Sequence, residues 1–386
     1  MDPLNIIQKL KRCLSILLYS PLASFFYLLK VEIPYFFVER IGHFLLDTDC
    51  YLKEHILKNG SLPKSILLAP SNFVSNKEVS NLWRQYFYVF ENPILCRILE
   101  PLSFHPIRRF KRKAFTANEG ETADSFYIYS KWHEKKPLLR LSDEQEALGN
   151  DLLKDIGINE NDWFVCFHNR EGGYAPDDEN IQRYRNFPFS DFSLAIEFIN
   201  SKGGKCVRMG DNSMEPSSHP LIIDYATSEY KSEILDLILG KRAKLFLGCT
   251  SGASLLSTIF GVPVAHCNMA PVTAVGMSHR DISIPMLLKD KNSNKILTIK
   301  EMITSDLANI RDAEVWSAKN VDFVKNSPKE ILELLEELYQ RVEGTYKSDQ
   351  QANKLNEEFK SMLKHGDFCF GASSRIGSKF INKYYY

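Results

Sequence analysis

A run of small polar residues in this 386-residue chain has the pattern of a phosphate-binding turn. The stretch AKLFLGCTSGASLLSTIFGVPVAHCN, residues 243–268, predicts a buried strand, a tight turn, a short helix and a second strand. Because the first N–H groups of a helix lack internal partners and carry partial positive charge, a helix N-terminus attracts anions. Thr250 and Ser251 can cap this helix and offer hydroxyl groups, and Gly252 permits a tight turn. The alternative, an ordinary capped helix, stays open for this segment taken alone.

Arginines stand at the ends of three other predicted strands. They are Arg40, Arg170 and Arg208. A planar guanidinium group suits diphosphate and carboxylate, and doubly wound sheets bind ligands beyond the carboxyl ends of their strands. Two such domains would place a site in the cleft between them. Structural ion pairs are the alternative role for Arg170 and Arg208.

The elements that would position these residues alternate between strand and helix. The first set is expected to begin with a strand at residues 35–39, a turn at 40–43 and a helix through Leu57, followed by the strands SILLAP and FYVFE. The second set includes the strands WFVCFH, KCVRMG and LIIDY, and a long helical pattern runs on from Ser327. Such alternation predicts parallel sheets and an α/β architecture.

The length of the chain predicts more than one domain, since single cores rarely exceed about 250 to 300 residues. We expect a hydrophobic, membrane-associating segment at 1–32, Rossmann-like domains at 33–155 and 156–325, and a helical C-terminal extension at 326–386. No repeat with a period typical of solenoids is apparent.

Charge and cysteine content exclude several classes of protein. The chain has 48 basic and 48 acidic residues, so bulk charge gives no case for a nucleic-acid partner. The basic run RRFKRK, residues 108–113, could face anionic lipid or an acidic acceptor, or be a solvated loop. Eight scattered cysteines without a C-x-x-C pair argue against a zinc site or a disulfide framework, and favour the reducing cytoplasm.

The N-terminus combines basic residues with an uncharged apolar run. Lys9, Lys11 and Arg12 precede residues 13–29, which contain Pro21. This run is marginal in length for a spanning helix, and the layout favours an anchor that lies in the membrane interface. A buried helix pair, a spanning helix and a cleaved signal peptide are the alternatives.

The order of several motifs resembles that of the GT-B glycosyltransferases. These motifs are FHNRE, YRNFPFSDFSLAIEFINSKGGKCVRMGD and LFLGCTSGASLLSTIFGVPV, with RIGHFLLDTD upstream. The first and third resemble the fucosyltransferase-like branch, and the combination resembles a family of bacterial surface-polysaccharide glycosyltransferases. The likeness covers most of residues 35–290. It implies a GT-B-like fold of two Rossmann-like domains facing a cleft, with 33–155 as the acceptor domain and 156–325 as the nucleotide-sugar domain.

The resemblance also implies roles for residues that match the motifs. Arg170 matches the arginine that contacts the donor diphosphate, with His168 beside it. Thr250, Ser251 and Gly252 match the phosphate-binding start of a helix.

Two positions near the next strand are further candidates for the donor. Arg208 and Asp211 could contact its ribose, base or diphosphate. The family usually has a second arginine and an aspartate after the first arginine, whereas residues 171–173 here are Glu-Gly-Gly. This departure leaves the identity of the nucleotide open.

His43 is the candidate general base, because RIGHFLL is similar to the Gly-His motif of several GT-B transferases. An imidazole accepts a proton near neutral pH, and an acidic neighbour would orient it. Asp47, one helical turn on, is the candidate orienting group, with Asp49 as the alternative. A histidine that only caps the following helix is the structural alternative. The acidic pair at residues 177–178 would serve as base only if His43 does not.

These observations predict a glycosyltransferase that needs neither a metal nor a cofactor. Arginine and a helix N-terminus can neutralise the departing diphosphate, and the DTD at residues 47–49 falls within a predicted helix. The expected partners are a nucleotide-sugar donor, a glycan or lipid-linked acceptor in cell-surface polysaccharide assembly, and the inner face of the plasma membrane on the cytoplasmic side. A nucleotide-sugar epimerase or hydrolase of the same fold, or a non-catalytic nucleotide-sugar-binding scaffold, is the alternative.

Overall fold

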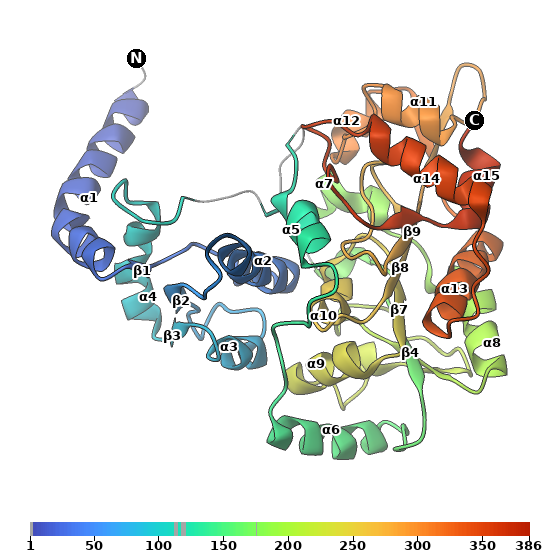
Figure 1. Cartoon of the computed structure of the whole chain (residues 1–386), viewed down its shortest axis with the longest axis horizontal. Helices are drawn as coiled ribbons and strands as arrows, with labels where there is room; N and C mark the ends of the chain where they lie inside the picture. Colours follow the sequence, from blue (N-terminus) through green and yellow to red (C-terminus); the bar gives the residue numbers. More distant parts are fainter. Residues whose placement is uncertain (1–2, 112–114, 117–120, 175) are drawn as a thin grey trace. The chain divides into compact units, whose positions relative to one another are not determined.

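The computed structural model describes residues 3–111, 115–116, 121–174 and 176–386 (Figure 1). The chain forms two compact units, Met1–Lys113 and Ala114–Tyr386. Each unit contains a parallel sheet and helices, so the expected α/β class is confirmed.

The first unit has a small parallel sheet with strand order β1-β2-β3. Helix α2 (Ile41–Asn59) follows β1 and precedes β2 in the chain. It ends at Gly60, which has a left-handed φ of 68°. Its elements, in chain order, are α1 (Pro3–Leu28), β1 (Val31–Glu32), α2 (Ile41–Asn59), β2 (Lys64–Leu68), α3 (Lys77–Trp83), β3 (Tyr88–Phe90), α4 (Pro93–Leu99) and a 3₁₀ helix (Glu100–Phe104).

The strand expected at residues 35–39 is wrong. The first strand is β1, and residues 33–37 form an irregular segment before α2. Pro34 lacks the N–H group that a strand needs for its ladder, so pairing stops before it. The aromatic residues of the segment still reach the core, where Phe36 packs edge-on against Tyr51 of α2.

Helix α1 continues through Pro21 as one helix and has two different faces. Tyr19, Ala23 and Phe26 pack with the apolar cluster around Leu99 and Leu102. The opposite face carries large apolar side chains at helical spacing. These exposed side chains are Leu14, Leu17, Leu18, Leu22, Phe25 and Leu28. No helix in the described residues has both the length and the apolar character needed to cross a membrane.

The second unit is built on a seven-stranded, fully parallel sheet with the order β12-β9-β8-β7-β4-β5-β6. Its strands are β4 (Phe164–Phe167), β5 (Lys205–Arg208), β6 (Ile222–Ile223), β7 (Leu245–Gly248), β8 (Val264–Met269), β9 (Ile282–Pro285) and β12 (Arg375–Ile376). An antiparallel pair, β10 (Leu287–Asp290) and β11 (Val321–Val324), stands beside it.

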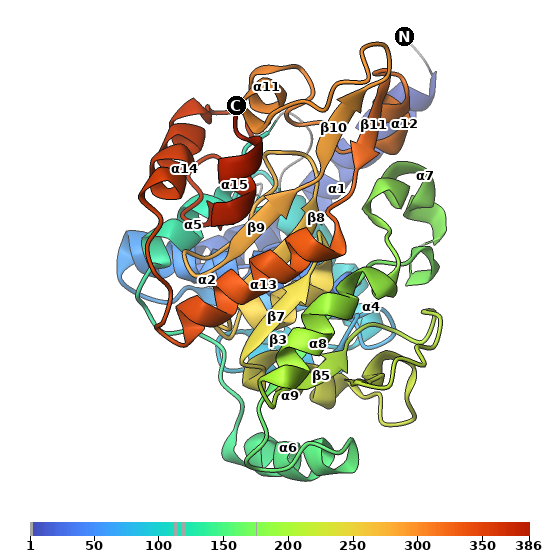
Figure 2. The same ribbon diagram turned by 90° about the vertical axis from the view of Figure 1, so that its right-hand side faces the viewer.

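Helices cover both faces of this sheet (Figures 1 and 2). Val165 and Phe167 of β4 face the core shared with α8 and α13, whereas Cys166 between them points to α9, where its Sγ approaches the carbonyl oxygen of Leu239. The helices are α5 (Asp124–Trp132), α6 (Asp143–Asp155), α7 (Glu179–Gln182), α8 (Ser193–Ser201), α9 (Glu233–Arg242), α10 (Leu255–Thr258), α11 (Ile299–Thr304), α12 (Ala313–Ser317), α13 (Pro328–Val342), α14 (Gln350–Met362) and α15 (Ser378–Tyr384).

The two compact units divide between residues 113 and 114, whereas the sequence predicted a domain boundary at residue 155. Helices α5 and α6 belong to the second unit. Glu146 of α6 binds Lys241 and Arg242 of α9, and Phe126 of α5 packs edge-on against Phe368. These contacts join residues far apart in sequence and hold α5 and α6 in the second unit.

Candidate functional site

The strand order of the second unit creates a switch point between β4 and β7. From β4 the chain adds β5 and β6 on one side, and from β7 it adds β8 and β9 on the other. This is the doubly wound order in which ligands bind beyond the carboxyl ends of the strands, at the point where the order reverses. Arg170 follows β4 and residues 249–252 follow β7, so both lie at this point.

The turn after β7 is anchored by an arginine from a distant segment. Arg185 donates from Nε to the carbonyl oxygen of Thr250 at 2.8 Å, and its Nη2 contacts the same oxygen. Because a trans peptide is planar, holding this carbonyl directs the N–H of Ser251 the opposite way. In the described part of the chain, the N–H groups of Thr250, Ser251 and Gly252 have no hydrogen-bond acceptor. The turn thus has three adjacent N–H groups available as donors, and the peptide that carries the Ser251 N–H is held by Arg185.

The side chains of this turn are partly used within the turn itself. The Thr250 hydroxyl points to the sulfur of Met269 at 3.1 Å, and the Ser251 hydroxyl accepts from the N–H of Ala253 at 3.4 Å. Gly252 begins a 3₁₀ turn, Gly252–Ser254, that leads into the four-residue α10. The expected cap at Ser251 is therefore present.

Arg170 is mostly buried at the switch point and faces a carboxylate. Its Nη1 lies 2.7 Å from Oε1 of Glu179 and also contacts Oδ1 of Asn186. Asn186 in turn donates from Nδ2 to Oε2 of Glu179 at 2.6 Å. The predicted arginine is in place, but its charge is balanced by Glu179 in this state.

Arg208 forms buried ion pairs, which the sequence analysis gave as the alternative to contact with the donor. Its side chain is 1% exposed. Nη2 donates to Oε1 of Glu171 at 2.8 Å, Nη1 lies 3.2 Å from both oxygens of Asp224, and Nη1 also donates to the carbonyl oxygen of Glu215 at 2.8 Å. Glu171 also accepts from the N–H of Glu215, so the network fastens the loop after β5 to the loop after β4.

His168 and Asp211 also bond within the protein. The His168 Nδ1 donates to the carbonyl oxygen of Met209 at 3.0 Å, and burial lowers the pKa of the ring. Asp211 accepts from the N–H of Ser213 at 2.9 Å and closes a turn. His168 therefore holds the ends of β4 and β5 together, and Asp211 shapes the loop that follows.

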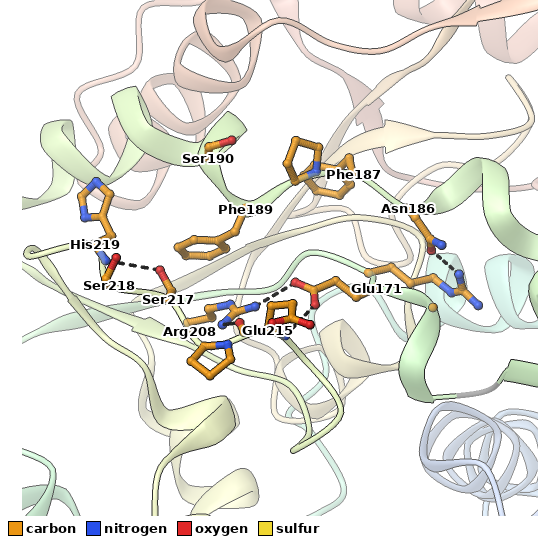
Figure 3. A pocket seen from close by; sticks show the side chains of 14 residues that line it. Glu171, Asn186, Phe187, Phe189, Ser190, Arg208, Glu215, Ser217, Ser218 and His219 are labelled. Atoms are coloured by element: carbon orange, nitrogen blue, oxygen red, sulfur yellow. Dashed lines mark hydrogen bonds and ion pairs between the residues drawn. The ribbon is translucent and has the colours of Figure 1, made fainter.

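A pocket of about 730 Å³ opens beside this network (Figure 3). The ring of Phe189 lies in its middle, with its centroid 4.9 Å from the Arg208 guanidinium carbon. Ser217 and His219 line one side, and Glu171 and Asn186 lie on the other. An apolar ring with polar groups around it suits a planar base or a sugar ring.

The candidate base belongs to the first unit. His43 lies in the first turn of α2, and its Nδ1 is 3.3 Å from Oδ2 of Asp47, as the spacing predicted. Asp49 instead pairs with Lys53 at 2.6 Å. The residue at the helix cap is Arg40, so His43 does not have the capping role that was the alternative.

Several residues at the switch point had no assigned role in the sequence analysis. They are Glu171, Glu179, Arg185, Asn186 and Phe189. The signal available was the RYRN motif at residues 183–186. Its contact with Thr250 spans 65 residues, so strand and helix patterns could not reveal it.

Within the described residues, no group of three or more histidine, cysteine, aspartate or glutamate side chains is placed to hold a metal ion. The basic run at residues 108–113 is described up to Lys111, where Arg109 donates to the carbonyl oxygen of Tyr27 at 2.8 Å and stacks on its ring. Residues 112–113 lie outside the described part.

Comparison with known proteins gives distant structural likenesses. No protein-family model matches the chain, and no curated protein matches it. The ADP-heptose LPS heptosyltransferase II of E. coli is 12% identical with a TM-score of 0.44, over 81% of this chain and 99% of that chain. A glycosyl transferase of family 9 from Veillonella parvula DSM 2008 is 11% identical with a TM-score of 0.42, over 66% and 85%. The iron-containing dodecameric glycosyltransferase TibC of enterotoxigenic E. coli is 10% identical with a TM-score of 0.38, over 81% and 76%. The chain is similar to these glycosyltransferases at a level that carries no argument about its reaction.

Proposed function

We propose that this protein is a GT-B-type glycosyltransferase that transfers a sugar from a nucleotide-sugar donor to a cell-surface polysaccharide or lipid-linked acceptor. One observation carries the proposal: Arg170 follows β4 and the turn at residues 250–252 follows β7, so both come after the carboxyl ends of the two strands that flank the switch point. Cationic and N–H donors in this position suit a diphosphate. The 730 Å³ pocket, which Arg170 helps to line, would take the nucleoside.

In this proposal the protein supplies charge neutralisation and a base. The acceptor hydroxyl attacks the anomeric carbon, and the bond from that carbon to the diphosphate oxygen breaks. Arg170 and the N–H groups of residues 250–252 stabilise the negative charge that develops on the leaving diphosphate. The hydroxyl proton passes to Nε2 of His43, since Nδ1 faces Asp47. No step requires a metal ion.

Donor binding is tested by a thermal-shift screen of the full chain against nucleoside diphosphates and nucleotide sugars. A ligand that binds only the folded state raises the melting temperature, and the rise grows with the logarithm of its concentration above the Kd. The donor found is then assayed for transfer to lipid-linked glycans, with and without EDTA. We expect EDTA-insensitive transfer. Release of free sugar or a changed sugar without transfer would favour the hydrolase or epimerase, and binding without any turnover would favour the scaffold.

Replacing Glu179 by glutamine is expected to tighten donor binding by about threefold. The carboxylate competes for Arg170 and repels a diphosphate, and its partly exposed position limits the effect. Isothermal titration with the donor measures the change. Asp177→Asn, an exposed acidic residue of the same loop, is the matched control and should leave the affinity unchanged. Weaker binding by the Glu179 variant would contradict a competing role.

The exposed face of α1 is proposed to lie on the inner face of the plasma membrane, where a lipid-linked acceptor would be presented. Burying a leucine or phenylalanine side chain stabilises binding by about 1.5–3 kcal/mol, and Lys11 and Arg12 are exposed at the start of this face. Leu17→Glu with Leu18→Glu should reduce binding to anionic vesicles by at least about tenfold. Flotation assays measure this. Leu62→Glu, which replaces an exposed leucine outside α1, is the control. If all variants bind vesicles as tightly as wild type does, α1 does not lie in the membrane interface.

A further inference from the structure

A small pocket lies at the opposite edge of the seven-stranded sheet from the switch point. Pro263, Ile282 and Arg375 stand at the amino ends of β8, β9 and β12 and line it. Because the strands are parallel, their amino ends share one edge, whereas Arg170 and the turn after β7 follow the carboxyl ends. The pocket, of about 160 Å³, is therefore separate from the proposed donor site.

Three guanidinium groups contribute to the lining of this pocket. The eight described residues that line the pocket include no aspartate or glutamate. These lining residues are Pro263, His279, Arg280, Ile282, Leu338, Arg341, Val342 and Arg375. The arginines come from three different segments, namely the loop before β9, the last turn of α13 and the start of β12. Convergence of like charges from separate elements is unfavourable unless an anion is present.

The protein satisfies only part of the hydrogen-bonding capacity of these arginines. Arg341 donates from Nε and Nη2 to Oε1 of Glu337 at 3.0 and 2.7 Å. Arg375 donates from Nη2 to Asn353 at 2.6 Å, and its Nε is buried without a hydrogen-bond partner among the described residues. Each guanidinium has five N–H donors, so several remain for a ligand.

The side chains that line the pocket carry three guanidinium groups and no carboxylate. Carboxylates outside the lining act on these groups: Glu337 pairs with Arg341 and is bonded to Ser378, and the charge of Glu357 also acts on Arg375. Burial lowers the pKa of Arg375, and the positive charge of Arg341 lowers it further. The pKa of His279 is lowered by burial and by the neighbouring His133 and Arg280. A bound anion would relieve this repulsion.

We propose that this pocket binds a small multivalent oxyanion, of the class of inorganic phosphate or pyrophosphate, between Arg280, Arg341 and Arg375. The planar fork of arginine matches the oxygen atoms of such anions. A bound oxyanion would join α13 and β12 to the start of β9, and so stabilise the C-terminal segment against the sheet. This site is independent of the proposed donor site, because it lies at the other edge of the same sheet.

We test the site by titrating the full chain with inorganic phosphate and with pyrophosphate. Potassium chloride at equal ionic strength is the control for the effect of salt alone. We expect saturable binding that persists in Arg170→Gln. Arg375→Gln should weaken it at least about tenfold, the loss typical of a charge-assisted pair. Arg280→Gln should weaken it severalfold without changing thermal unfolding in the absence of the anion. Lys295→Gln, an exposed lysine outside the pocket, is the control.

Two results would overturn the proposal. One is the absence of saturable binding by either anion. The other is binding that is unchanged in both Arg280→Gln and Arg375→Gln, or lost in Arg170→Gln, which would place the anion at the switch point. Arg280 hydrogen-bonds through Nη1 to the carbonyl oxygen of Gly261 and is exposed, so its variant decides the question if Arg375→Gln does not fold.

Discussion

Replacing His43 by asparagine is expected to lower the turnover of sugar transfer by about 10²–10⁴-fold. Asparagine keeps a similar size but cannot accept the proton of the acceptor hydroxyl. Because His43 belongs to the first unit and the proposed diphosphate contacts belong to the second, donor affinity should not change. Product formation under saturating donor and acceptor gives turnover, and isothermal titration gives donor affinity.

The same helix provides a matched control for His43. His55 also lies on α2, and its Nε2 is 3.2 Å from Oε2 of Glu32, but it has no proposed role in transfer. His55→Asn should retain turnover once its folding is confirmed. Asp47→Asn should reduce turnover less than His43→Asn, since Asp47 only orients the ring. Near-normal turnover in His43→Asn would reject His43 as the base.

Replacing Arg208 by methionine is expected to lower the free energy of unfolding by about 3–5 kcal/mol. The substitution leaves the carboxylates of Glu171 and Asp224 close together without the cation between them. Removing one partner of a buried ionic network costs more than the pair itself contributes, because the remaining charges stay desolvated. Chemical denaturation followed by circular dichroism measures the loss.

The first residue of the same strand is the control for Arg208. Lys205 pairs with Asp162 at 3.0 Å, but both side chains are about one third exposed. An exposed pair contributes about 0–1 kcal/mol, so Lys205→Met should be nearly neutral. If Arg208→Met is no more destabilising than Lys205→Met, the network does not hold the two loops.

Much of the second unit could be predicted from local sequence. The runs WFVCFH, KCVR and LFLG are short and apolar, and each became a buried strand of the parallel sheet. Ser142 and Ser232 precede the apolar runs of α6 and α9, and both cap their helices by accepting backbone hydrogen bonds. Caps and buried strands depend on neighbours in sequence, which is why the pattern sufficed.

Features that depend on distant contacts were not predictable. The strand order, and with it the switch point, follows from how β4 pairs with both β5 and β7. The sequence pattern after Ser327 predicts helix only and gives no sign of β12. This two-residue strand pairs with β9 and forms one edge of the sheet. So short a strand gains its stability from pairing and not from its own residues.

The candidate site divides in the same way. The motifs located Arg170, the turn at residues 250–252 and the contact of His43 with Asp47. They could not show that Glu179 balances Arg170 or that Arg185 holds the turn, because these partners are chosen by the path of the loop after β4. Arg208 was a candidate for the donor, and the structure shows its guanidinium in an ion network and over the ring of Phe189 in the pocket.

The central claim is that a nucleoside diphosphate binds at the switch point of the second unit. Isothermal titration of wild type, Arg170→Gln and Arg183→Gln with the nucleotide found in the screen tests it most directly. Arg183 is an exposed arginine whose Nη1 bonds to the carbonyl oxygen of Asn180, so it controls for charge alone. The account predicts that Arg170→Gln weakens binding at least about tenfold while Arg183→Gln binds as wild type. Equal affinity of all three proteins for the nucleotide would contradict it.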